Sequence, residues 1–328
     1  MKVLVTGGAG NIGSHTAKAL AHAGHEPVVF DDLRTGHAEN VRWGPLVRES
    51  LDDSAAIRRA LADHRIDAVV HFAASAYVGV SMREPAAYFR NNVANTLNLL
   101  EAMLAAQVGT IVFSSSCATY GVPPASPIVE SMLLRPVNPY GESKVMVERM
   151  LRWMGEIHGM RWTALRYFNA AGADPDGELG ESHDPETHLI PLAIAAALGG
   201  DPLRVFGADY PTPDGTPIRD YVHVADLADA HVAALDALAS GGASGGLNLG
   251  TGRGHSVRDV LRAVERAIGA PVPHVVEARR PGDPPILVAD PSAARAALRW
   301  EPRFTSLDDI AATAAAWARA RAGARAPR

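Results

Sequence analysis

The sequence Thr6-Gly7-Gly8-Ala9-Gly10-Asn11-Ile12-Gly13 joins an apolar run, Lys2–Thr6, to a helix-like pattern from about Ile12 to Ala23. Gly7, Gly10 and Gly13 have the spacing that allows a tight turn, a close approach of backbone to phosphate, and close packing of helix on strand. Free N–H groups at the start of the helix then face a diphosphate. With 30 glycines in the chain, the spacing alone is weak; its place between strand and helix makes it a nucleotide-binding signal.

Short apolar runs and helix-like patterns alternate through the first half of the chain. Strands are expected at Lys2–Thr6, Pro27–Phe30, Ala68–Phe72, Thr110–Ser114 and Trp162–Tyr167, and helices at Ser54–His64, Tyr88–Gln107 and Pro139–His158. This order requires crossover connections and therefore a parallel sheet, and strands that are apolar throughout indicate helices on both faces. The pattern predicts an α/β fold with a doubly wound parallel sheet, the Rossmann fold.

The second half has a different texture. Ala173–Glu186 and Gly207–Gly215 are rich in Gly, Pro and Asp, which indicates long loops. A strand is expected at Gly246–Gly250, helices at Ser256–Ile268 and Ser306–Ala320, and a frayed tail from about Arg319. We divide the chain into residues 1–168, a dinucleotide-binding domain, and residues 169–328, a smaller α/β substrate-binding domain. The chain is expected to revisit the first sheet around residues 219–250.

Composition excludes several classes of protein. Thirty-one basic and 36 acidic residues leave a net charge of −5, without the basic run of a non-specific nucleic-acid binder. One cysteine excludes an intramolecular disulfide framework and a thiolate zinc cluster. The longest apolar stretch, Ile190–Leu198, contains a proline and falls far short of a membrane span, and Val3–Val5 is too short for a signal peptide. We expect a cytoplasmic protein without a membrane partner.

Two acidic residues, Asp31 and Asp32, follow the second expected strand, the first of them eighteen residues after Gly13. A carboxylate at this place accepts hydrogen bonds from the adenosine ribose and repels a 2′-phosphate, which favours NAD over NADP. For Asp32, a solvated surface charge is an equally good interpretation.

A second group of polar residues follows the fourth expected strand. Ser114-Ser115-Ser116 ends that strand, and Tyr140 and Lys144 stand four residues apart, on one face of a helix. A nearby ammonium stabilises a phenolate, so Lys144 is expected to lower the pKa of Tyr140 and make it a base near neutral pH. The chain has only three lysines, so this spacing arises by chance in about 6% of such sequences.

Taken together, these segments resemble the extended short-chain dehydrogenases/reductases and, among them, the UDP-glucose 4-epimerases. The resemblance covers nearly the whole chain, and its later segments are specific to the epimerase branch. It rests on Gly7–Thr16, His71–Ala74, Asn91–Val93, Phe113–Gly121, Asn138–Glu148, Arg166–Gly172, Asp209–Val224, Leu247–Gly252 and Arg280–Asp283.

The resemblance implies a role for each matching residue. In catalysis, Ser116 bonds the sugar 4-oxygen, Tyr140 takes its proton, and Lys144 tunes Tyr140. The implied NAD-binding residues are Gly7, Gly10, Asn11, Ile12, Gly13, Asp31, Asp32, Phe72, Ala73, Ala74, Asn91, Ser114, Tyr140, Lys144 and Tyr167. The implied UDP-sugar contacts are Ser116, Tyr140, Asn169, His188, Leu189, Arg204, Phe206, Arg219, Arg280, Asp283 and Leu287. Planar guanidinium groups suit a diphosphate, and a carboxylate suits ribose hydroxyls.

The implied reaction inverts C4 of a UDP-sugar through a transient 4-keto intermediate, with bound NAD accepting and returning hydride. A homodimer is the implied assembly. His188 departs from the asparagine frequent at its position, which puts that diphosphate contact in doubt. Leu287 bounds the pocket near the sugar 2-substituent, and we hypothesise that its size disfavours N-acetylated sugars.

Other functions remain as alternatives. The preferred substrate of a 4-epimerase of this kind could be UDP-xylose, UDP-arabinose or UDP-GlcNAc. A nucleotide-sugar 4,6-dehydratase would need Asp-Glu where this chain has Cys117-Ala118, and an inactive NAD-binding regulator would commonly lack the Tyr140–Lys144 pair. No metal is expected, because the 13 histidines lack a zincin-type spacing and His183 with His188 is weak evidence for one.

Overall fold

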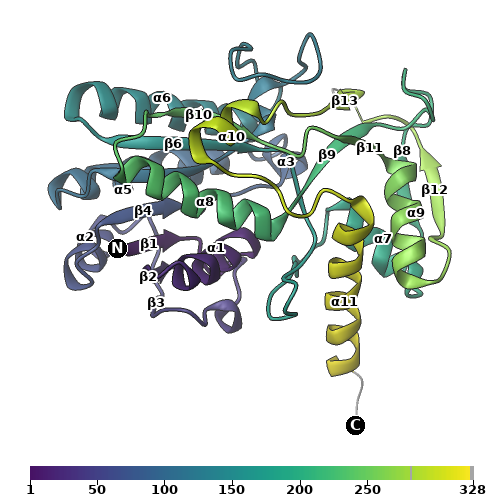
Figure 1. The fold of residues 1–328 in the computed structure, drawn as a ribbon, viewed down its shortest axis with the longest axis horizontal. Helices are drawn as coiled ribbons and strands as arrows, with labels where there is room; N and C mark the ends of the chain where they lie inside the picture. Colours follow the sequence, from purple (N-terminus) through teal and green to yellow (C-terminus); the bar gives the residue numbers. More distant parts are fainter. Residues whose placement is uncertain (281–282, 326–328) are drawn as a thin grey trace.

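A seven-stranded parallel sheet forms the larger part of the molecule in the computed structural model, which describes residues 1–280 and 283–325 (Figure 1). Its strand order is β10-β6-β5-β4-β1-β2-β3. The strands are β1 (Lys2–Thr6), β2 (Glu26–Phe30), β3 (Leu46–Val47), β4 (Ala68–His71), β5 (Thr110–Ser116), β6 (Arg161–Tyr167) and β10 (Gly245–Leu249). The doubly wound sheet expected from the sequence is confirmed.

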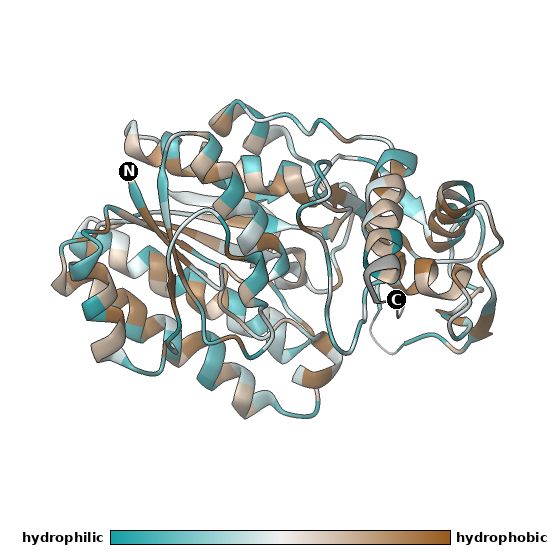
Figure 2. Ribbon diagram, turned by 90° about the horizontal axis from the view of Figure 1, so that it is seen from below, coloured by the Kyte–Doolittle hydropathy of each residue, from teal (hydrophilic) through white to brown (hydrophobic). Residues whose placement is uncertain are grey.

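Helices cover both faces of this sheet. One face packs against α2 (Ser54–Asp63), α5 (Asn95–Ala105) and α6 (Pro139–His158), and the other against α1 (Asn11–His22), α8 (Val224–Ala239) and α10 (Ser292–Leu298). Alternate residues of β1 show the division, since Leu4 joins the first core while Val3 and Val5 join the second. Figure 2 shows the apolar strands enclosed between helices that turn their polar sides outward.

The chain returns to this sheet late in the sequence. The helix α8 packs on α1, and β10 extends the sheet by pairing in parallel with β6, Leu247 opposite Leu165. Residues 224–249 thus complete the larger part, although they follow the segments that start the smaller one.

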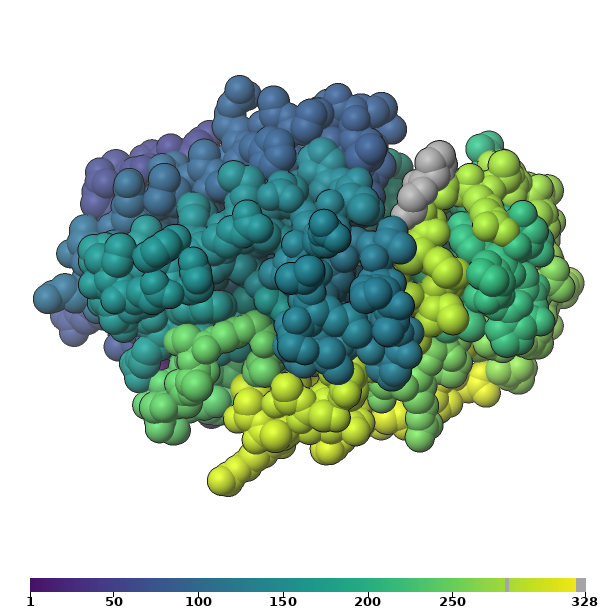
Figure 3. Space-filling model, turned by 90° about the horizontal axis from the view of Figure 1, so that it is seen from above, coloured from purple at the N-terminus to yellow at the C-terminus, as the bar shows by residue number. Residues whose placement is uncertain are grey.

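The smaller part stands at one end of the molecule, where green and yellow segments gather beside the purple-to-teal larger part (Figure 3). It has a sheet of β7 (Asn169–Ala171), β9 (Ile218–His223), β11 (Gly254–Ser256) and β13 (Ile286–Leu287), and a pair β8 (Leu203–Phe206) and β12 (His274–Glu277). Its helices α7 (Leu189–Ala197), α9 (Val257–Ile268) and α11 (Leu307–Arg325) share one apolar core. Among the described residues, no helix is long and apolar enough to cross a membrane.

Two expected helices differ from the structure. The helix expected at Tyr88–Gln107 is present as one unbroken helical segment. It begins earlier, with α4 (Pro85–Tyr88), and continues through a π-helix η2 (Phe89–Ala94), which was not expected, into α5. Short helices α3 (Val78–Ser81), η1 (Ala38–Asn40) and η3 (Cys117–Tyr120) were not expected. The last helix, α11, continues to Arg325, beyond the fraying predicted from Arg319.

Candidate active site

The carboxyl ends of the parallel strands place the polar residues of several loops along one edge of the sheet. The glycine loop follows β1, Asp31 follows β2, Phe72 follows β4, and Ser116 ends β5. In doubly wound sheets this edge is where ligands bind.

The loop of residues 7–13, here called the glycine loop, is packed so closely that no side chain fits at Gly7 or Gly13. Gly7 has a φ of +71°, and a Cβ there would lie 2.6 Å from the backbone N of Ala73. A Cβ on Gly13 would lie 2.2 Å from the Gly7 carbonyl oxygen. At Gly10 the closest protein atom would be 3.3 Å away, so this glycine is not required by packing and leaves its face open to a ligand.

The start of α1 suits an anion. No side chain caps this helix, and its first turn carries no acidic residue. The first N–H groups of a helix lack intrahelical partners, and the helix dipole adds a partial positive charge at the same place. Asn11 and Ile12 open the helix here, and the buried Oδ1 of Asn11 has no hydrogen-bond partner in the described structure. The loop therefore fits the diphosphate of a dinucleotide.

Asp31 is buried and tied to the glycine loop. Its Oδ2 accepts a hydrogen bond from the backbone N–H of Ala9, and its Oδ1 accepts one from Leu33, both at 2.9 Å. Burial raises the pKa of the Asp31 carboxyl, and the two backbone N–H groups oppose that rise. The carboxylate lies where a ribose would follow the diphosphate.

Asp32 and Asn91 meet through Arg34, which sequence reasoning missed. The Arg34 Nε donates to Asp32 Oδ2 at 2.6 Å, and its Nη2 donates to Asn91 Oδ1 at 2.8 Å. Asn91 lies in the π-helix, whose next residue, Asn92, is buried and holds Ser75 with its side-chain amide. The half-exposed Asp32 is thus one member of an ion-paired group.

The segment after β4 lies against the glycine loop. The backbone N–H groups of Phe72 and Ala73 both donate to the Thr6 carbonyl, and Phe72, Ala73 and Ala74 are half-buried. Ser114 and Tyr167 are buried, and their hydroxyls bond to each other. Each hydroxyl thus has a partner within the protein, so neither side chain needs a ligand to satisfy its hydrogen bonding.

Ser116, Tyr140 and Lys144 come together where β5 meets the start of α6. A Cβ on Gly141 would lie 2.5 Å from the Ala118 carbonyl oxygen, so α6 begins in close contact with η3. The Ser116 side chain lies close enough to the Tyr140 hydroxyl to lower the pKa of Tyr140. One helical turn further on, Lys144 Nζ lies 5.7 Å from the centre of the Tyr140 ring and donates to the Ser114 carbonyl at 2.8 Å.

The pKa of Tyr140 differs from the expectation. Burial raises it to about 12, and the nearby Ser116 side chain offsets only part of that rise. Burial also lowers the pKa of Lys144 to about 7, while the charge of Glu148 opposes that change. Desolvation of the phenolate is thus the largest influence on the pKa of Tyr140. Tyr140 therefore needs additional stabilisation of its phenolate in a complex before it can act as a base.

Four of the residues expected to bind the nucleotide of the substrate form two pairs. Arg219 in β9 donates from Nη2 to Asp283 Oδ1. The Arg280 guanidinium lies 3.9 Å from the centre of the Phe206 ring. Arg204 shares the face of β8 that Phe206 occupies, because Val205 between them points into the core. Arg204 pairs with Glu277 at 3.5 Å.

The remaining substrate residues surround the same region. Leu287 in β13 pairs with Arg219 in β9 and packs against an apolar cluster beside Cys117. Asn169 begins β7, which pairs with β9. His188 precedes α7 and Leu189 begins it, but the imidazole of His188 turns toward Glu181 and Glu186. The sequence analysis named His183 and His188 but missed their partners Glu181 and Glu186. It also missed the buried Glu148, which stands four residues after Lys144 on the same helix.

Comparisons with known proteins agree with this geometry. Residues 3–250 match the NAD dependent epimerase/dehydratase family. The chain is 51% identical over 316 residues to the UDP-glucose 4-epimerase of Rhizobium meliloti (strain 1021), covering 96% of this chain and 95% of that protein.

Solved structures give the same result. A UDP-glucose 4-epimerase from Brucella ovis in complex with NAD is 53% identical, with a TM-score of 0.94 over 96% of this chain and 97% of that one. The enzyme from Bifidobacterium longum in complex with NAD⁺ and UDP is 37% identical, with a TM-score of 0.93 over 98% and 99% of the two chains. The chain therefore belongs to the NAD dependent epimerase/dehydratase family.

Proposed function

We propose that this protein interconverts UDP-glucose and UDP-galactose by inverting C4 of the sugar, with NAD as a bound cofactor. The observation that carries the proposal is the meeting of Ser116, Tyr140 and Lys144 at the carboxyl edge of the sheet, next to a glycine loop that fits a dinucleotide. Relatives named UDP-glucose 4-epimerase, about half identical over nearly the whole length, support the choice of reaction.

The NAD site is assigned to residues around the glycine loop. The uncapped start of α1 would hold the diphosphate, Asp31 the adenosine ribose, and Phe72 to Ala74 would line the loop from the neighbouring strand. Bound NAD would supply the redox chemistry at C4 of the sugar. Lys144 Nζ, which is buried and bonded to the Ser114 carbonyl, would hold the nicotinamide ribose.

Proton transfer is assigned to Tyr140. Its phenolate oxygen takes the proton of the sugar 4-hydroxyl and, as the phenol, later returns it, so one group serves both directions of the reaction. The Ser116 hydroxyl, which lies beside that of Tyr140, orients the 4-oxygen. Burial raises the pKa of Tyr140 to about 12. The positive charge of NAD⁺ bound beside Tyr140 would stabilise the phenolate and oppose this effect.

The UDP group is assigned to the smaller part of the molecule. Arg219 and Arg280 supply guanidinium groups for the diphosphate, and Asp283 accepts hydrogen bonds from the uridine ribose. Arg219 and Asp283 already bond each other, and Arg280 lies on Phe206, so their side chains are positioned by the protein.

The test is to incubate the purified protein, without added cofactor, with UDP-galactose and to follow the products by NMR. Formation of UDP-glucose is expected, together with loss of turnover by a factor of about 10² or more in Tyr140→Phe. Binding of UDP to Tyr140→Phe, measured by calorimetry, is expected to persist. No conversion even after NAD is added would overturn the proposal, and conversion of UDP-xylose alone would change the substrate.

We also infer a homodimer, in which the outer faces of α5 and α6 form the interface. Met146, Trp153 and Ile157 are exposed and share one face of α6, and Leu97 is exposed on α5. Light scattering after size exclusion is expected to give twice the chain mass for the wild type and a monomer for Trp153→Arg/Ile157→Glu. A matched change on another exposed surface, Val276→Glu, is expected to leave the dimer intact.

Two further assignments stay predictions. We propose the division into an NAD-binding domain, residues 1–168, and a UDP-sugar-binding domain, residues 169–328, with α8 and β10 packing on the first. We also propose a cytoplasmic location, with which a single free cysteine, Cys117, agrees. Limited proteolysis tests the first, and cell fractionation the second.

A further inference from the structure

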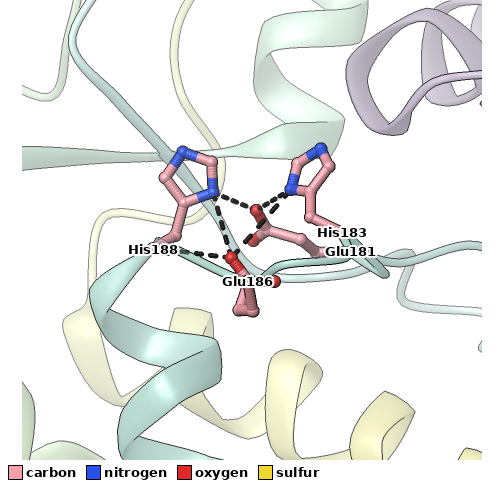
Figure 4. A group of neighbouring side chains, drawn as sticks. All are labelled: Glu181, His183, Glu186 and His188. Atoms are coloured by element: carbon pink, nitrogen blue, oxygen red, sulfur yellow. Dashed lines mark hydrogen bonds and ion pairs between the residues drawn. The ribbon is translucent and has the colours of Figure 1, made fainter. Parts of the chain in front are cut away.

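Two carboxylates and two imidazoles converge in the loop that leads into α7. They belong to Glu181, His183, Glu186 and His188, which we call the His/Glu cluster. Figure 4 shows the four side chains turned toward one another from a single short segment. The segment borders the glycine loop, since His183 lines a small cavity together with Gly10 and Asn11.

The ligand-type atoms of the His/Glu cluster are spaced as in a metal centre. One nitrogen or oxygen atom from each residue lies within 4.8 Å of all the others. The Nδ1 of His183 is 2.9 Å from Glu181 Oε1 and 4.0 Å from Glu186 Oε1, and the Nδ1 of His188 is 3.5 Å from Glu186 Oε1. His188 Nδ1 also hydrogen-bonds Glu181 Oε1 directly, so an ion that binds both atoms has to replace this bond. A tetrahedral ion with bonds of about 2.1 Å places its ligand atoms about 3.4 Å apart, within this range.

Contacts around the cluster hold the donor groups in place. The backbone N–H groups of Thr187 and His188 donate to Glu186 Oε1 at 2.7 and 2.8 Å. The Trp317 indole donates to the Glu181 carbonyl at 3.0 Å, and the Tyr77 ring lies edge-on to His183. Such outer contacts orient metal ligands in known centres.

The donor groups of the cluster are shielded from solvent to different degrees. The Glu181 side chain is only 7% exposed, and those of Glu186 and His183 are 20% and 24% exposed. A cation held among these groups would be bound mainly by protein atoms, with two carboxylates to balance a charge of +2.

A second acidic group in the same loop provides a contrast. Asp174, Asp176 and Glu178 also lie close together, but all three bond the ammonium of Lys18 at 2.7–2.9 Å. Their charge is already balanced by a protein side chain, so they do not form a comparable site.

We propose that the His/Glu cluster binds one divalent first-row transition metal ion, with Zn²⁺ as the best match to two nitrogen and two oxygen ligands. The ligands are Nδ1 of His183 and His188 and one carboxylate oxygen each of Glu181 and Glu186. The bound ion would link the segment beside the glycine loop to the start of α7. The proposal does not depend on the proposed reaction. Ligation through Nδ1 leaves Nε2–H of His188 free to donate to a substrate.

The experiment uses the full-length protein, purified without an affinity tag and treated with a chelator. Titration with Zn²⁺ in a calorimeter is expected to give one site per chain, and Mg²⁺ none, because Mg²⁺ prefers oxygen ligands. Co²⁺ is expected to give the visible absorption of tetrahedral coordination, a readout independent of activity. Absence of stoichiometric binding of both Zn²⁺ and Co²⁺ would overturn the proposal.

Variants locate the binding. His183→Gln and Glu181→Gln are each expected to weaken Zn²⁺ binding by more than about tenfold, since even outer-contact losses cost that much. Asp176→Asn, in the neighbouring acidic group, is the matched control and is expected to bind Zn²⁺ normally. Unchanged Zn²⁺ affinity in both cluster variants would also sink the proposal. Circular dichroism without metal shows whether each variant is folded, and a variant that is not is replaced by Glu186→Gln.

Discussion

Lys144 shows how one buried residue can cost stability at the same place where it is needed for the reaction. It is 2% exposed, and burial lowers its pKa to about 7. Between that pH and the ordinary lysine value near 10, the unfolded chain binds more protons than the folded one, so the free energy of unfolding rises with pH.

We therefore predict that wild type gains stability relative to Lys144→Met by about 1.4 kcal/mol per pH unit between pH 7 and 9. At pH 7 the variant is expected to be the more stable of the two, because methionine carries no charge to desolvate. Urea denaturation of both proteins, freed of nucleotide, measures the difference. Parallel stability curves over this pH range would contradict the prediction.

Leu287 is a second residue whose effect can be measured directly. It lies in β13 opposite Arg219 and is partly buried beside Cys117. If it limits the space for the sugar 2-substituent, Leu287→Ala is expected to raise kcat/KM for UDP-GlcNAc relative to UDP-glucose by about tenfold. Leu287→Ile, of equal volume, is the control. Turnover of UDP-GlcNAc by wild type that rivals turnover of UDP-glucose would refute this role.

Single residues were predictable from the sequence where spacing and rarity coincide. Tyr140 and Lys144 stand one helical turn apart in a chain with three lysines, and the structure places them on one face as expected. The sequence could not show how Asp32 is used, because its partners, Arg34 and then Asn91, meet it only in the folded chain. The direction of the Tyr140 pKa was wrong for a similar reason: burial depends on the whole surroundings.

At the scale of elements, a buried polar network joins α6 to the edge of the sheet formed by β5, β6 and β10. Glu148 accepts hydrogen bonds from Arg166 at 2.6 and 3.0 Å and from the Ser115 hydroxyl at 2.5 Å. Arg166 also donates to the Tyr120 hydroxyl, which donates in turn to Asn248 in β10. The network fixes the helix that carries Tyr140 and Lys144 onto β5, β6 and β10.

Removing one partner is expected to leave the other charge buried and unpaired. We predict that Glu148→Met and Arg166→Met each lower the free energy of unfolding by about 3–5 kcal/mol, whereas Glu148→Met/Arg166→Met recovers most of that loss. Urea denaturation of wild type, these two single variants and the double variant completes the cycle. A double variant as unstable as the sum of the single variants would show that no such pairing matters.

The helical elements were predictable where their apolar period runs unbroken. The start and end of α6 follow from Asn138, whose side chain accepts from Gly141, and from Gly159 in the left-handed region. The π-helix Phe89–Ala94 was not predictable, because one extra residue per turn leaves no clear trace in the apolar pattern. The polar contacts of this π-helix are made with residues distant in the sequence, since Asn92 bonds Ser75 and, in α6, Ser143.

At the scale of the molecule, the larger sheet was predictable and the smaller sheet was not. In the smaller part the sequence did predict two helices, at Ser256–Ile268 and Ser306–Ala320, which the structure has as α9 and α11. The strands of the larger sheet are four or more residues long, β3 excepted, and carry continuous apolar runs. The strands of the smaller sheet have as few as two residues and pair with partners far along the chain, as β13 does with β9. Short strands are defined by their partners rather than by local pattern.

Lys18 ties the two parts of the molecule together. It lies in α1 against the sheet, and its ammonium bonds Asp174, Asp176 and Glu178 from the loop that leads to the smaller part. Burial lowers the pKa of Lys18, but the bonds to the three carboxylates outweigh burial and raise it above its usual range. The Lys18 and Asp174 side chains are both less than one-tenth exposed, so neither charge is well solvated by water.

We predict that Lys18→Met lowers the free energy of unfolding by about 3 kcal/mol, near the lower limit for a broken buried pair because the other two carboxylates reach solvent. Adding Asp174→Asn is expected to restore much of that loss, since it removes the charge left unpaired in the interior. Lys2→Met, which breaks only a surface pair at 3.9 Å, is the control and is expected to change stability by less than about 0.5 kcal/mol. Chemical denaturation measures all of them. If Lys18→Met proved as stable as Lys2→Met, the connection between the two parts would rest on their apolar contacts, and the three carboxylates would have to be solvated in solution.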